Sequence, residues 1–184
     1  VLRRQRQMCI RDSLGAVPVL TSSDLLSLEN ERDRSIYVNA RPRSTAAEAL
    51  RSIRTNILVR TPDNGPQKRL LIASAVPREG KSFISSNLSS IIAMTGSRVL
   101  LIDADLRRPT QHKLFGITND RGLSSVLVDG APIESAITPT HVKGLDLMPS
   151  GPRPANPAEL LGSSRMTRML DALTAYDFVI IDSS

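Results

Sequence analysis

The stretch Val76-Pro-Arg-Glu-Gly-Lys-Ser82 decides how the rest of the chain is interpreted. It follows a short apolar run and precedes a helical pattern, so a glycine-containing loop opens a helix. Backbone N–H groups at such a junction bind phosphate oxygens. Gly80 lets the backbone approach the phosphates, Lys81 supplies a cation for the β- and γ-phosphates, and Ser82 offers a hydroxyl to Mg²⁺. The loop therefore predicts a nucleoside triphosphate site.

Two further apolar runs end on carboxylates and fit the same site. Leu100-Leu-Ile-Asp-Ala-Asp105 and Phe178-Val-Ile-Ile-Asp182 read as buried strands of a parallel sheet. Asp103 and Asp105 lie two residues apart and can project the same way. Either can hold the water shell of Mg²⁺ or accept a proton from an attacking hydroxyl, and Asp182 is the predicted metal-side carboxylate. The alternative is that each acid only caps a neighbouring helix.

The alternation of strands and helices predicts the fold class. It is an α/β protein of the P-loop NTPase type, with a parallel β-sheet flanked by helices. We expect strands at 69–75, 99–104, 145–148 and 178–182. We also expect one helix that begins near residue 45 and three more helices at 81–95, 122–128 and 157–175. Because residue 184 follows the last strand so closely, we interpret the fold as truncated at the C-terminus.

The N-terminal segment differs in character from the rest. Met8-Cys-Ile-Arg-Asp12 is what the transposon end used in sequencing-library preparation encodes, so we interpret residues 1–12 as a non-native adapter translation. A native basic juxtamembrane segment is the alternative. Excluding these residues removes Cys9, the only cysteine, and with it any disulfide. Residues 13–44 are predicted to be a juxtamembrane-like linker, solvated from 21 onward, and 45–184 an incomplete P-loop domain.

Composition narrows the function classes. The chain has 184 residues, of which 40% are hydrophobic, enough for the core of one domain. Its net charge is +6, and half of this excess lies in the first twelve residues. With three Phe, two Tyr and no Trp, the chain has too few aromatic side chains for a base-stacking platform, so we expect no nucleic-acid partner. His112 and His141 are isolated and support no metal site.

One helical stripe has two interpretations. Glu48, Arg51 and Arg54 recur at a spacing of three on the helix that begins near residue 45. On physical grounds alone, an exposed and self-paired helix face is favoured over a contact between subunits.

Taken together, these motifs resemble those of the bacterial tyrosine kinases of the capsular and exopolysaccharide type. The segment from Ser74 to Ser82 resembles the family's Walker A motif, Leu100 to Pro109 its Walker A′ motif, and Val179 to Ser183 its Walker B motif. Two more segments match: Glu48 to Asn56 resembles the E-x-x-R-x-x-R oligomerisation motif, and Gly151 to Leu161 the S-G-x-x-P-x-N-P-x-E-L-L segment. The resemblance covers about residues 45–184 and reverses the preference for a self-paired helix face.

The resemblance implies an ATP- and Mg²⁺-dependent tyrosine autokinase domain over 45–184 that regulates polysaccharide synthesis and export by phosphorylating tyrosines of a neighbouring subunit. It implies a ring-forming homo-oligomer, through Glu48, Arg51 and Arg54, and a polysaccharide co-polymerase or transmembrane activator as partner, fused or separate. Because Leu14 to Leu20 resembles a stretch that follows a membrane helix in fused relatives, the expected location is the cytoplasmic side of the plasma membrane. The residues implied as catalytic are Lys81, Asp103 and Asp105; as nucleotide-binding, Ser74, Pro77, Arg78, Glu79, Gly80, Lys81, Ser82 and Phe83; as metal-binding, Ser82, Asp103 and Asp182.

The sequence also departs from the family pattern. Ala75 and Arg78 stand where many P-loops or relatives have glycine, and Ser184 stands where Walker B continues with proline. The tyrosine-rich tail is absent, so we expect the chain to be inactive by itself. Two alternatives stay open: a nucleotide-dependent assembly scaffold without kinase activity, and a partitioning-type ATPase. The second is disfavoured because Val76 occupies the position of that class's signature lysine.

Overall fold

The computed structural model describes residues 13–18, 20, 37–60, 67–74, 76 and 79–183. Its centre is a five-stranded sheet with the strand order β1-β5-β2-β4-β3. Neighbouring strands among β1, β5, β2 and β4 run parallel, and β3 pairs antiparallel with β4. The strands are β1 (Lys68–Ile72), β2 (Val99–Asp103), β3 (Thr138–Pro139), β4 (Leu145–Met148) and β5 (Phe178–Asp182).

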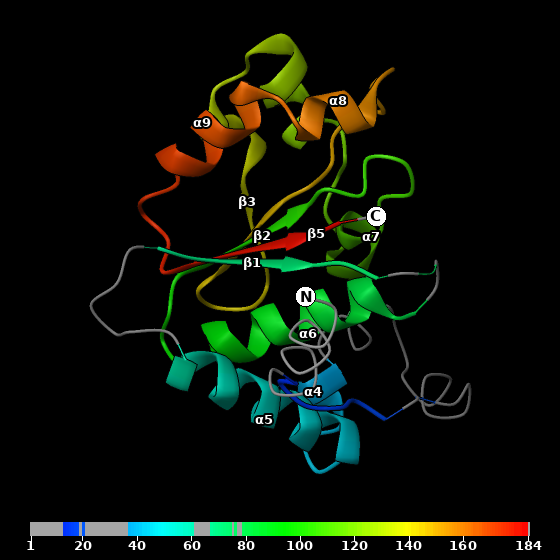
Figure 1. The fold of residues 1–184 in the computed structure, drawn as a ribbon, viewed down its shortest axis with the longest axis vertical. Helices are drawn as coiled ribbons and strands as arrows, with labels where there is room; N and C mark the ends of the chain where they lie inside the picture. Colours follow the sequence, from blue (N-terminus) through cyan, green and yellow to red (C-terminus); the bar gives the residue numbers. More distant parts are fainter. Residues whose placement is uncertain are drawn as a thin grey trace, which may run out of the picture.

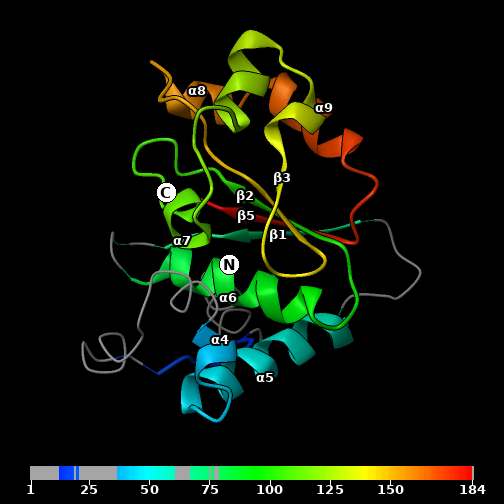
Figure 2. The same cartoon turned by 180° about the vertical axis from the view of Figure 1, so that it is seen from behind.

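Helices cover both faces of this sheet (Figures 1 and 2). On one face lies α6 (Lys81–Ala93), with α5 (Thr45–Arg60) and the short α4 (Tyr37–Ala40) stacked beneath it. The other face is covered by α8 (Pro157–Leu161) and α9 (Ser164–Ala172), together with the π-helical turn η1 (Ser125–Asp129) and the 3₁₀ turn η2 (Ile133–Ala136). A five-residue helix, α7 (Gln111–Phe115), follows β2.

The central strands are buried on both faces, which explains their continuous apolar runs. Along β2, Leu101 packs into the core on the α6 side, whereas Leu100 and Ile102 pack into the core under α9. Strand β5 alternates in the same way, with Ile180 on the α6 side and Val179 on the other. The α/β fold with a parallel sheet and flanking helices is therefore confirmed.

The first strand differs from its prediction. The expected buried strand over 69–75 ends at Ile72, and its residues alternate between half-buried and exposed. The reason is position: β1 is an edge strand that pairs only with β5 among the described strands, and Leu71 is 65% exposed. Sequence alone does not distinguish an apolar edge strand from a central one.

Two helix predictions need correction. The single helix expected over 157–175 is two helices, because Gly162 ends α8 and Ser163 starts α9 by accepting a hydrogen bond from Met166 N–H. Asn156 occupies the N-cap position of α8, but its side chain donates to Glu159 instead of capping the helix. The helix expected over 122–128 is the π-helical turn η1.

The linker prediction is wrong for its described C-terminal part. Tyr37 and Val38 are buried in α4, where Val38 N–H donates to the side-chain oxygen of Asn87 on α6. Leu14 and Val17 also pack against core clusters. The adapter interpretation of residues 1–12 and the linker residues 21–36 lie outside the described residues. In the described part of the chain, none of the helices combines the length and the apolar character needed to cross a membrane.

Candidate nucleotide site

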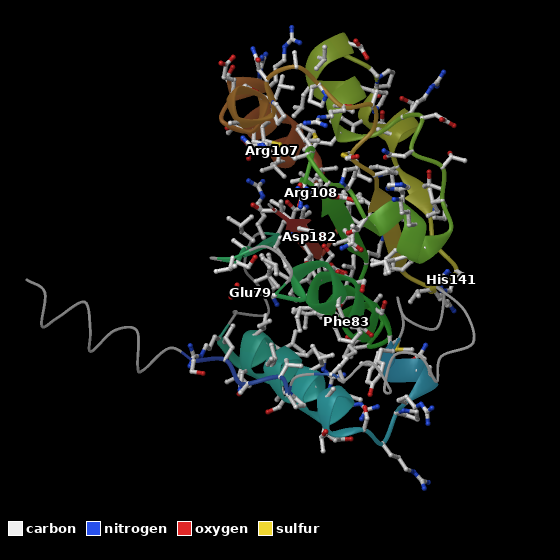
Figure 3. The ribbon with its side chains drawn as sticks, turned by 90° about the vertical axis from the view of Figure 1, so that its right-hand side faces the viewer. Glu79, Phe83, Arg107, Arg108, His141 and Asp182 are labelled. Atoms are coloured by element: carbon white, nitrogen blue, oxygen red, sulfur yellow. The ribbon has the colours of Figure 1, made fainter. Side chains whose placement is uncertain are left out.

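The predicted site residues meet where β2 and β5 end and α6 begins. Asp103 and Asp182 are register partners at the last position of the two adjacent strands. Gly80 precedes α6 with a φ of 82°, a left-handed conformation that favours glycine. Figure 3 shows Asp182 between Glu79 on one side and the exposed Arg107 and Arg108 on the other. The structure thus brings the three predicted motifs to one edge of the sheet.

Lys81 is shared between two carboxylates. Its Nζ lies 3.5 Å from Asp182 Oδ1 and 3.7 Å from Asp105 Oδ2, and its side chain is 11% exposed. In such a secluded place, an ammonium group depends on its partners, because removing one leaves an uncompensated charge. The two acids hold the lysine at the start of α6, where phosphate binding requires it.

Asp182 is completely buried, and each of its carboxylate oxygens accepts a hydrogen bond. Ser85 Oγ donates to Oδ1 over 3.1 Å, and Gln111 Nε2 donates to Oδ2 over 2.7 Å. Because a buried carboxylate without partners is costly, these contacts and the nearby Lys81 fix its orientation. Asp182 is therefore held in place before any ligand arrives.

Asp103 is also completely buried, but its partners are backbone groups. Oδ2 accepts from the N–H groups of Thr110 and Gln111, each over 3.0 Å, and Oδ1 accepts from Asp105 N–H over 3.2 Å. Burial raises the pKa of Asp103 to about 7, the N–H of Gln111 opposes this rise, and the charge of Asp182 adds to it. Asp103 thus ties the loop after β2 to the N-terminus of α7.

Asp105 is the more accessible acid of the pair. Its side chain is 15% exposed, and its Oδ1 accepts from Arg108 N–H over 3.0 Å, while Oδ2 faces Lys81. A ligand above the strand ends can therefore reach Asp105 without displacing backbone hydrogen bonds from Asp103. Because β2 ends at Asp103, the loop after it separates this structural carboxylate from the reachable Asp105.

Among the residues that the structure describes, the other predicted nucleotide-binding residues, before and just after the start of α6, do not take part in the buried carboxylate contacts. Ser74 Oγ donates to the carbonyl of Val76, whose N–H donates to Glu79, and both contacts are exposed. Phe83 turns its ring away to an edge-to-face contact with Tyr37, at 5.5 Å between centroids, so only its backbone is left for a phosphate. Pro77 and Arg78 lie outside the described residues.

The donor types fit a magnesium ion. Ser82, Asp103 and Asp182 offer hydroxyl and carboxylate oxygens, which are hard ligands. Among the described residues, no three His, Cys, Asp or Glu side chains are grouped so as to hold a metal by themselves. This arrangement suits Mg²⁺, which is commonly bound by one or two carboxylates together with substrate phosphates and water.

The predicted oligomerisation residues lie outside this site, on α5. Glu48 and Arg51 form an ion pair within the helix, and Arg51 also donates to the carbonyl of Pro42. The buried Nε of Arg54 has no hydrogen-bond partner in the described structure. The observed ion pair thus fits the self-paired interpretation for Glu48 and Arg51.

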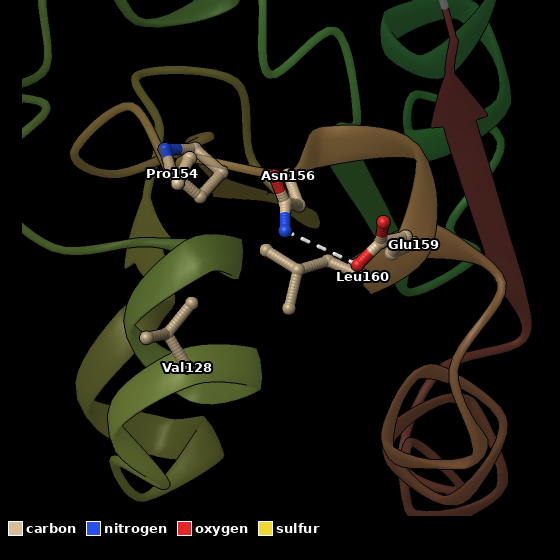
Figure 4. A pocket seen from close by; sticks show the side chains of 6 residues that line it. Val128, Pro154, Asn156, Glu159 and Leu160 are labelled. Carbon is tan, nitrogen blue, oxygen red and sulfur yellow. Dashed lines mark hydrogen bonds between the residues drawn. The ribbon is translucent and has the colours of Figure 1, made fainter.

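A separate hollow lies between η1 and the start of α8 (Figure 4). Its volume is 320 Å³, and it is lined by Val128, Pro154, Ala155, Asn156, Glu159 and Leu160. None of the predicted nucleotide-site residues lines it, and its walls are mainly apolar. It is a feature of the opposite helical layer and not part of the phosphate site.

Sequence reasoning missed Gln111, Thr110 and Ser85. Gln111 is fully buried and joins the ends of β2 and β5 to α6 through its backbone and side chain. Its only local signal is its place at the start of a five-residue helix after Pro109, which is too short to stand out by periodicity. Ser85 lies one turn beyond Lys81 on α6, a spacing that could have suggested a neighbour.

Comparison with known proteins agrees with this geometry. The family model described as AAA domain matches residues 78–184. The tyrosine-protein kinase YwqD of Bacillus subtilis is 44% identical over 151 residues, which are 82% of this chain and 63% of that protein. This chain thus spans less than two thirds of the length of that relative.

Solved structures of bacterial tyrosine kinase domains are also similar to this chain. The BceF tyrosine kinase domain superposes with a TM-score of 0.78 at 37% identity, covering 92% of this chain and 70% of that one. The septum site-determining protein MinD of Pyrococcus horikoshii, complexed with Mg-ADP, superposes with a TM-score of 0.55 at 25% identity, covering 63% of this chain and 48% of that one. The chain therefore belongs to the AAA domain family and, by its relatives, to the bacterial tyrosine kinases of the capsular and exopolysaccharide type.

Proposed function

We propose that this chain binds Mg-ATP as the nucleotide-binding part of a protein-tyrosine autokinase that regulates capsular or exopolysaccharide synthesis and export. The observation that carries the proposal is the position of Lys81 between Asp105 and Asp182 at the opening of α6. Phosphate oxygens arriving at the Gly80 turn would compete with these acids for the lysine, and bound Mg²⁺ would neutralise the charge that develops on the phosphates. The names of the relatives support the kinase assignment.

In the proposed reaction, a tyrosine oxygen attacks the γ-phosphorus while the bond to the ADP oxygen breaks. The tyrosine proton passes to a carboxylate, and we assign this role to Asp105 because both oxygens of the buried Asp103 already accept N–H groups. Most of the rate enhancement would come from positioning and charge neutralisation. Asp103 then acts by holding the loop.

The acceptor tyrosine is proposed to come from another subunit or a further part of the protein. Tyr37 is 3% exposed, and the hydroxyl of Tyr176 donates to Asp146 over 2.8 Å. Burial, followed by this hydrogen bond, raises the pKa of Tyr176 further above its ordinary value. Both tyrosines of the chain are therefore held by internal contacts, which supports the proposal that the acceptor lies elsewhere.

Nucleotide binding by the chain tests the proposal directly. Titration of the purified chain with a fluorescent ATP analogue in Mg²⁺ should give saturable binding, and Lys81→Met should abolish it. Lys143→Met, which removes an exposed lysine in the turn before β4, is the matched control and should bind as the unmodified chain does. Equal binding by the Lys81→Met protein would refute the assignment.

A protein that also carries the acceptor tyrosines tests the kinase step. After incubation with Mg-ATP, phosphotyrosine should appear in the unmodified protein and should be absent from Lys81→Met. Asp105→Asn should lower the labelling rate more than it lowers ATP affinity. Retained control of polymer length by a non-phosphorylating, correctly assembled Lys81→Met protein would instead favour the scaffold function.

Assembly into a ring, contact with a polysaccharide co-polymerase and a location at the inner face of the plasma membrane belong to the same proposal. Glu48 is exposed and Arg51 and Arg54 are half-buried along one stripe of α5, which supports a contact with a second subunit through this helix. Sedimentation of the full protein should show oligomers, and Arg54→Ala should dissociate them. Unchanged oligomers in this variant would contradict the interface.

A further inference from the structure

The buried side chain of Gln111 lies where the ends of β2, β5 and the start of α6 meet. We propose that Gln111 is a positioning residue that couples metal binding at Asp182 to the phosphate loop, an inference that rests on the Mg-nucleotide function proposed above. It is not a predicted catalytic residue, and none of the three motifs contains it. Its role follows from three of its polar atoms.

Two of these atoms make three hydrogen bonds to different parts of the site. Nε2 donates to Asp182 Oδ2 over 2.7 Å and to the carbonyl oxygen of Ser82 over 3.0 Å. The backbone N–H donates to Asp103 Oδ2 over 3.0 Å. Gln111 thus connects the carboxylate ends of two strands to the first turn of α6, and a shift of any one of them is transmitted to the others.

The orientation of the Gln111 amide is determined by its neighbours. A carboxylate and a backbone carbonyl both accept hydrogen bonds and cannot donate, so the NH₂ group must face them. The oxygen Oε1 therefore points away from both acceptors. It is buried and has no hydrogen-bond partner in the part of the chain that the structure describes.

Buried acceptors normally have a hydrogen-bond donor, so Oε1 is expected to accept from a group that arrives with the ligand. Magnesium in nucleotide sites usually keeps several water molecules, and such waters are strong donors. We assign Oε1 of Gln111 to accept from a water bound to the metal, while Nε2 holds Asp182. Outer partners of this kind typically change metal affinity by about 10- to 100-fold when they are removed.

The test compares ADP affinity of the whole chain in Mg²⁺ with ADP affinity in EDTA, because the ratio measures the coupling between metal and nucleotide. Gln111→Leu keeps the size of the side chain and removes its polar atoms. We expect this variant to lower the ratio by about tenfold or more. Its affinity for metal-free ADP should stay within about threefold of the unmodified chain, because Gly80 and Lys81 are intact.

Gln67→Leu is the matched control. Gln67 is a partly buried glutamine whose Nε2 also donates to two acceptors, the carbonyls of Leu173 and Tyr176, at the opposite end of β1. The Gln67→Leu variant loses comparable hydrogen bonds at a place away from the site. Its ratio of ADP affinities in Mg²⁺ and in EDTA should therefore be unchanged. A ratio that falls equally in both variants would mean that general loosening is responsible, and the inference would be wrong.

If Gln111→Leu does not fold, Gln111→Glu tests the role of Gln111 in metal binding instead. This variant preserves the shape and the acceptors but removes both donors and places a second carboxylate beside Asp182. Because Mg²⁺ relieves the repulsion between the two acids, the metal alone should raise the melting temperature more than in the unmodified chain. An equal response to Mg²⁺ would overturn the inference.

The unmodified chain separates the two proposals. If it binds ADP better in Mg²⁺ than in EDTA and folded Gln111→Leu does the same, the role of Gln111 is refuted while the nucleotide function stands. If the unmodified chain shows no metal-dependent binding, the proposed function fails, and the role of Gln111 fails with it.

Discussion

The proposed nucleotide site is exposed around Gly80 and buried around Asp103. On the first side, Val76 is 56% exposed, and Glu79 contacts it through a single exposed hydrogen bond. On the second side, Asp103 and Gln111 are completely buried and share a hydrogen bond. In the part of the loop that the structure describes, the side proposed to receive phosphates thus makes few internal contacts, whereas the carboxylates on the other side are held by hydrogen bonds.

The difference has a physical reason. Carboxylates that bind a metal must not reorganise, so their orientation is set by donors within the fold. A loop that surrounds phosphates obtains its hydrogen bonds from the ligand itself, and its N–H groups therefore need no partners within the protein. Substitutions on each side test whether the two sides differ in this way.

The largest effect is expected from adding one methyl group at the buried Gly122, for comparison with the same change at Gly80. A Cβ at position 122 would lie 2.1 Å from the carbonyl oxygen of Pro149 and 2.4 Å from the N atom of Gly151, so the backbone of this turn beside the end of β4 would have to move. Gly122→Ala should lower the free energy of unfolding by more than about 4 kcal/mol. The measurement is urea denaturation followed by circular dichroism.

The corresponding change on the exposed side is Gly80→Ala. A Cβ at this position meets nothing within 4 Å, so only the left-handed φ of 82° is penalised. The expected loss is about 1–2 kcal/mol. Equal losses for the two alanine variants would show that the backbone at Gly80 is as tightly confined as the buried turn at Gly122.

Leucine truncation in two strands gives the next largest effect. Leu101 on β2 is completely buried, whereas Leu71 on β1 is 65% exposed. Leu101→Ala should cost about 3 kcal/mol because it opens a cavity, and Leu71→Ala should cost less than about 0.5 kcal/mol. Denaturation midpoints of the two variants, measured side by side, check this. A large loss for Leu71→Ala would indicate that something covers the β1 edge.

The buried side should also respond to pH. Burial raises the pKa of Asp103 to about 7, so between about pH 4 and 7 the folded chain binds more protons at this group than the unfolded chain does. Its contribution to stability therefore falls as pH rises through this window, by at most about 1.4 kcal/mol per pH unit.

Asp103→Asn isolates this contribution. The difference in unfolding free energy between the unmodified chain and this variant should shrink as pH rises from 5 to 7. A difference that stays constant over this range would mean that the proton on Asp103 is not linked to folding. Asp171→Asn, which removes an exposed acid on α9, is the matched control for the substitution itself.

The smallest effect is expected at Glu79. Its side chain is exposed, and its hydrogen bond to Val76 N–H is 3.3 Å long. Glu79→Ala should change the free energy of unfolding by no more than about 0.5 kcal/mol. If this variant were as unstable as Leu101→Ala, the phosphate side would be as firmly held as the carboxylate side, and the contrast drawn above would be lost.

Much of the fold follows from local patterns. The continuous apolar runs ending at Asp103 and Asp182 predict parallel strands, and the period of α5 starting at Thr45 predicts its helix. The break at Gly162 was not predicted, because the apolar period continues across it into α9. The burial of Tyr37 was not predicted either, since it depends on a contact with Phe83, far away in sequence.

The candidate nucleotide site, like the fold, was predicted only in part from the sequence. Lys81, Asp105 and Asp182 were predicted from their positions after or before strands and helices, and the structure places all three together. The different burial of Asp103 and Asp105 could not be read from the sequence, because a spacing of two residues gives both the same direction on an ideal strand. The strand ends at Asp103, and the loop after it turns Asp105 outward.

The sequence by itself determined the α/β class, the phosphate loop before α6 and the presence of acids at strand ends, because these depend on short-range periodicity and on residue type. Only the tertiary structure decided that β1 lies at an edge, that Asp103 is sequestered by backbone N–H groups, and that Gln111 joins the three motifs. Those properties depend on which segments become neighbours once the sheet has formed, and hydrogen bonds between residues as distant as Gln111 and Asp182 leave no local pattern.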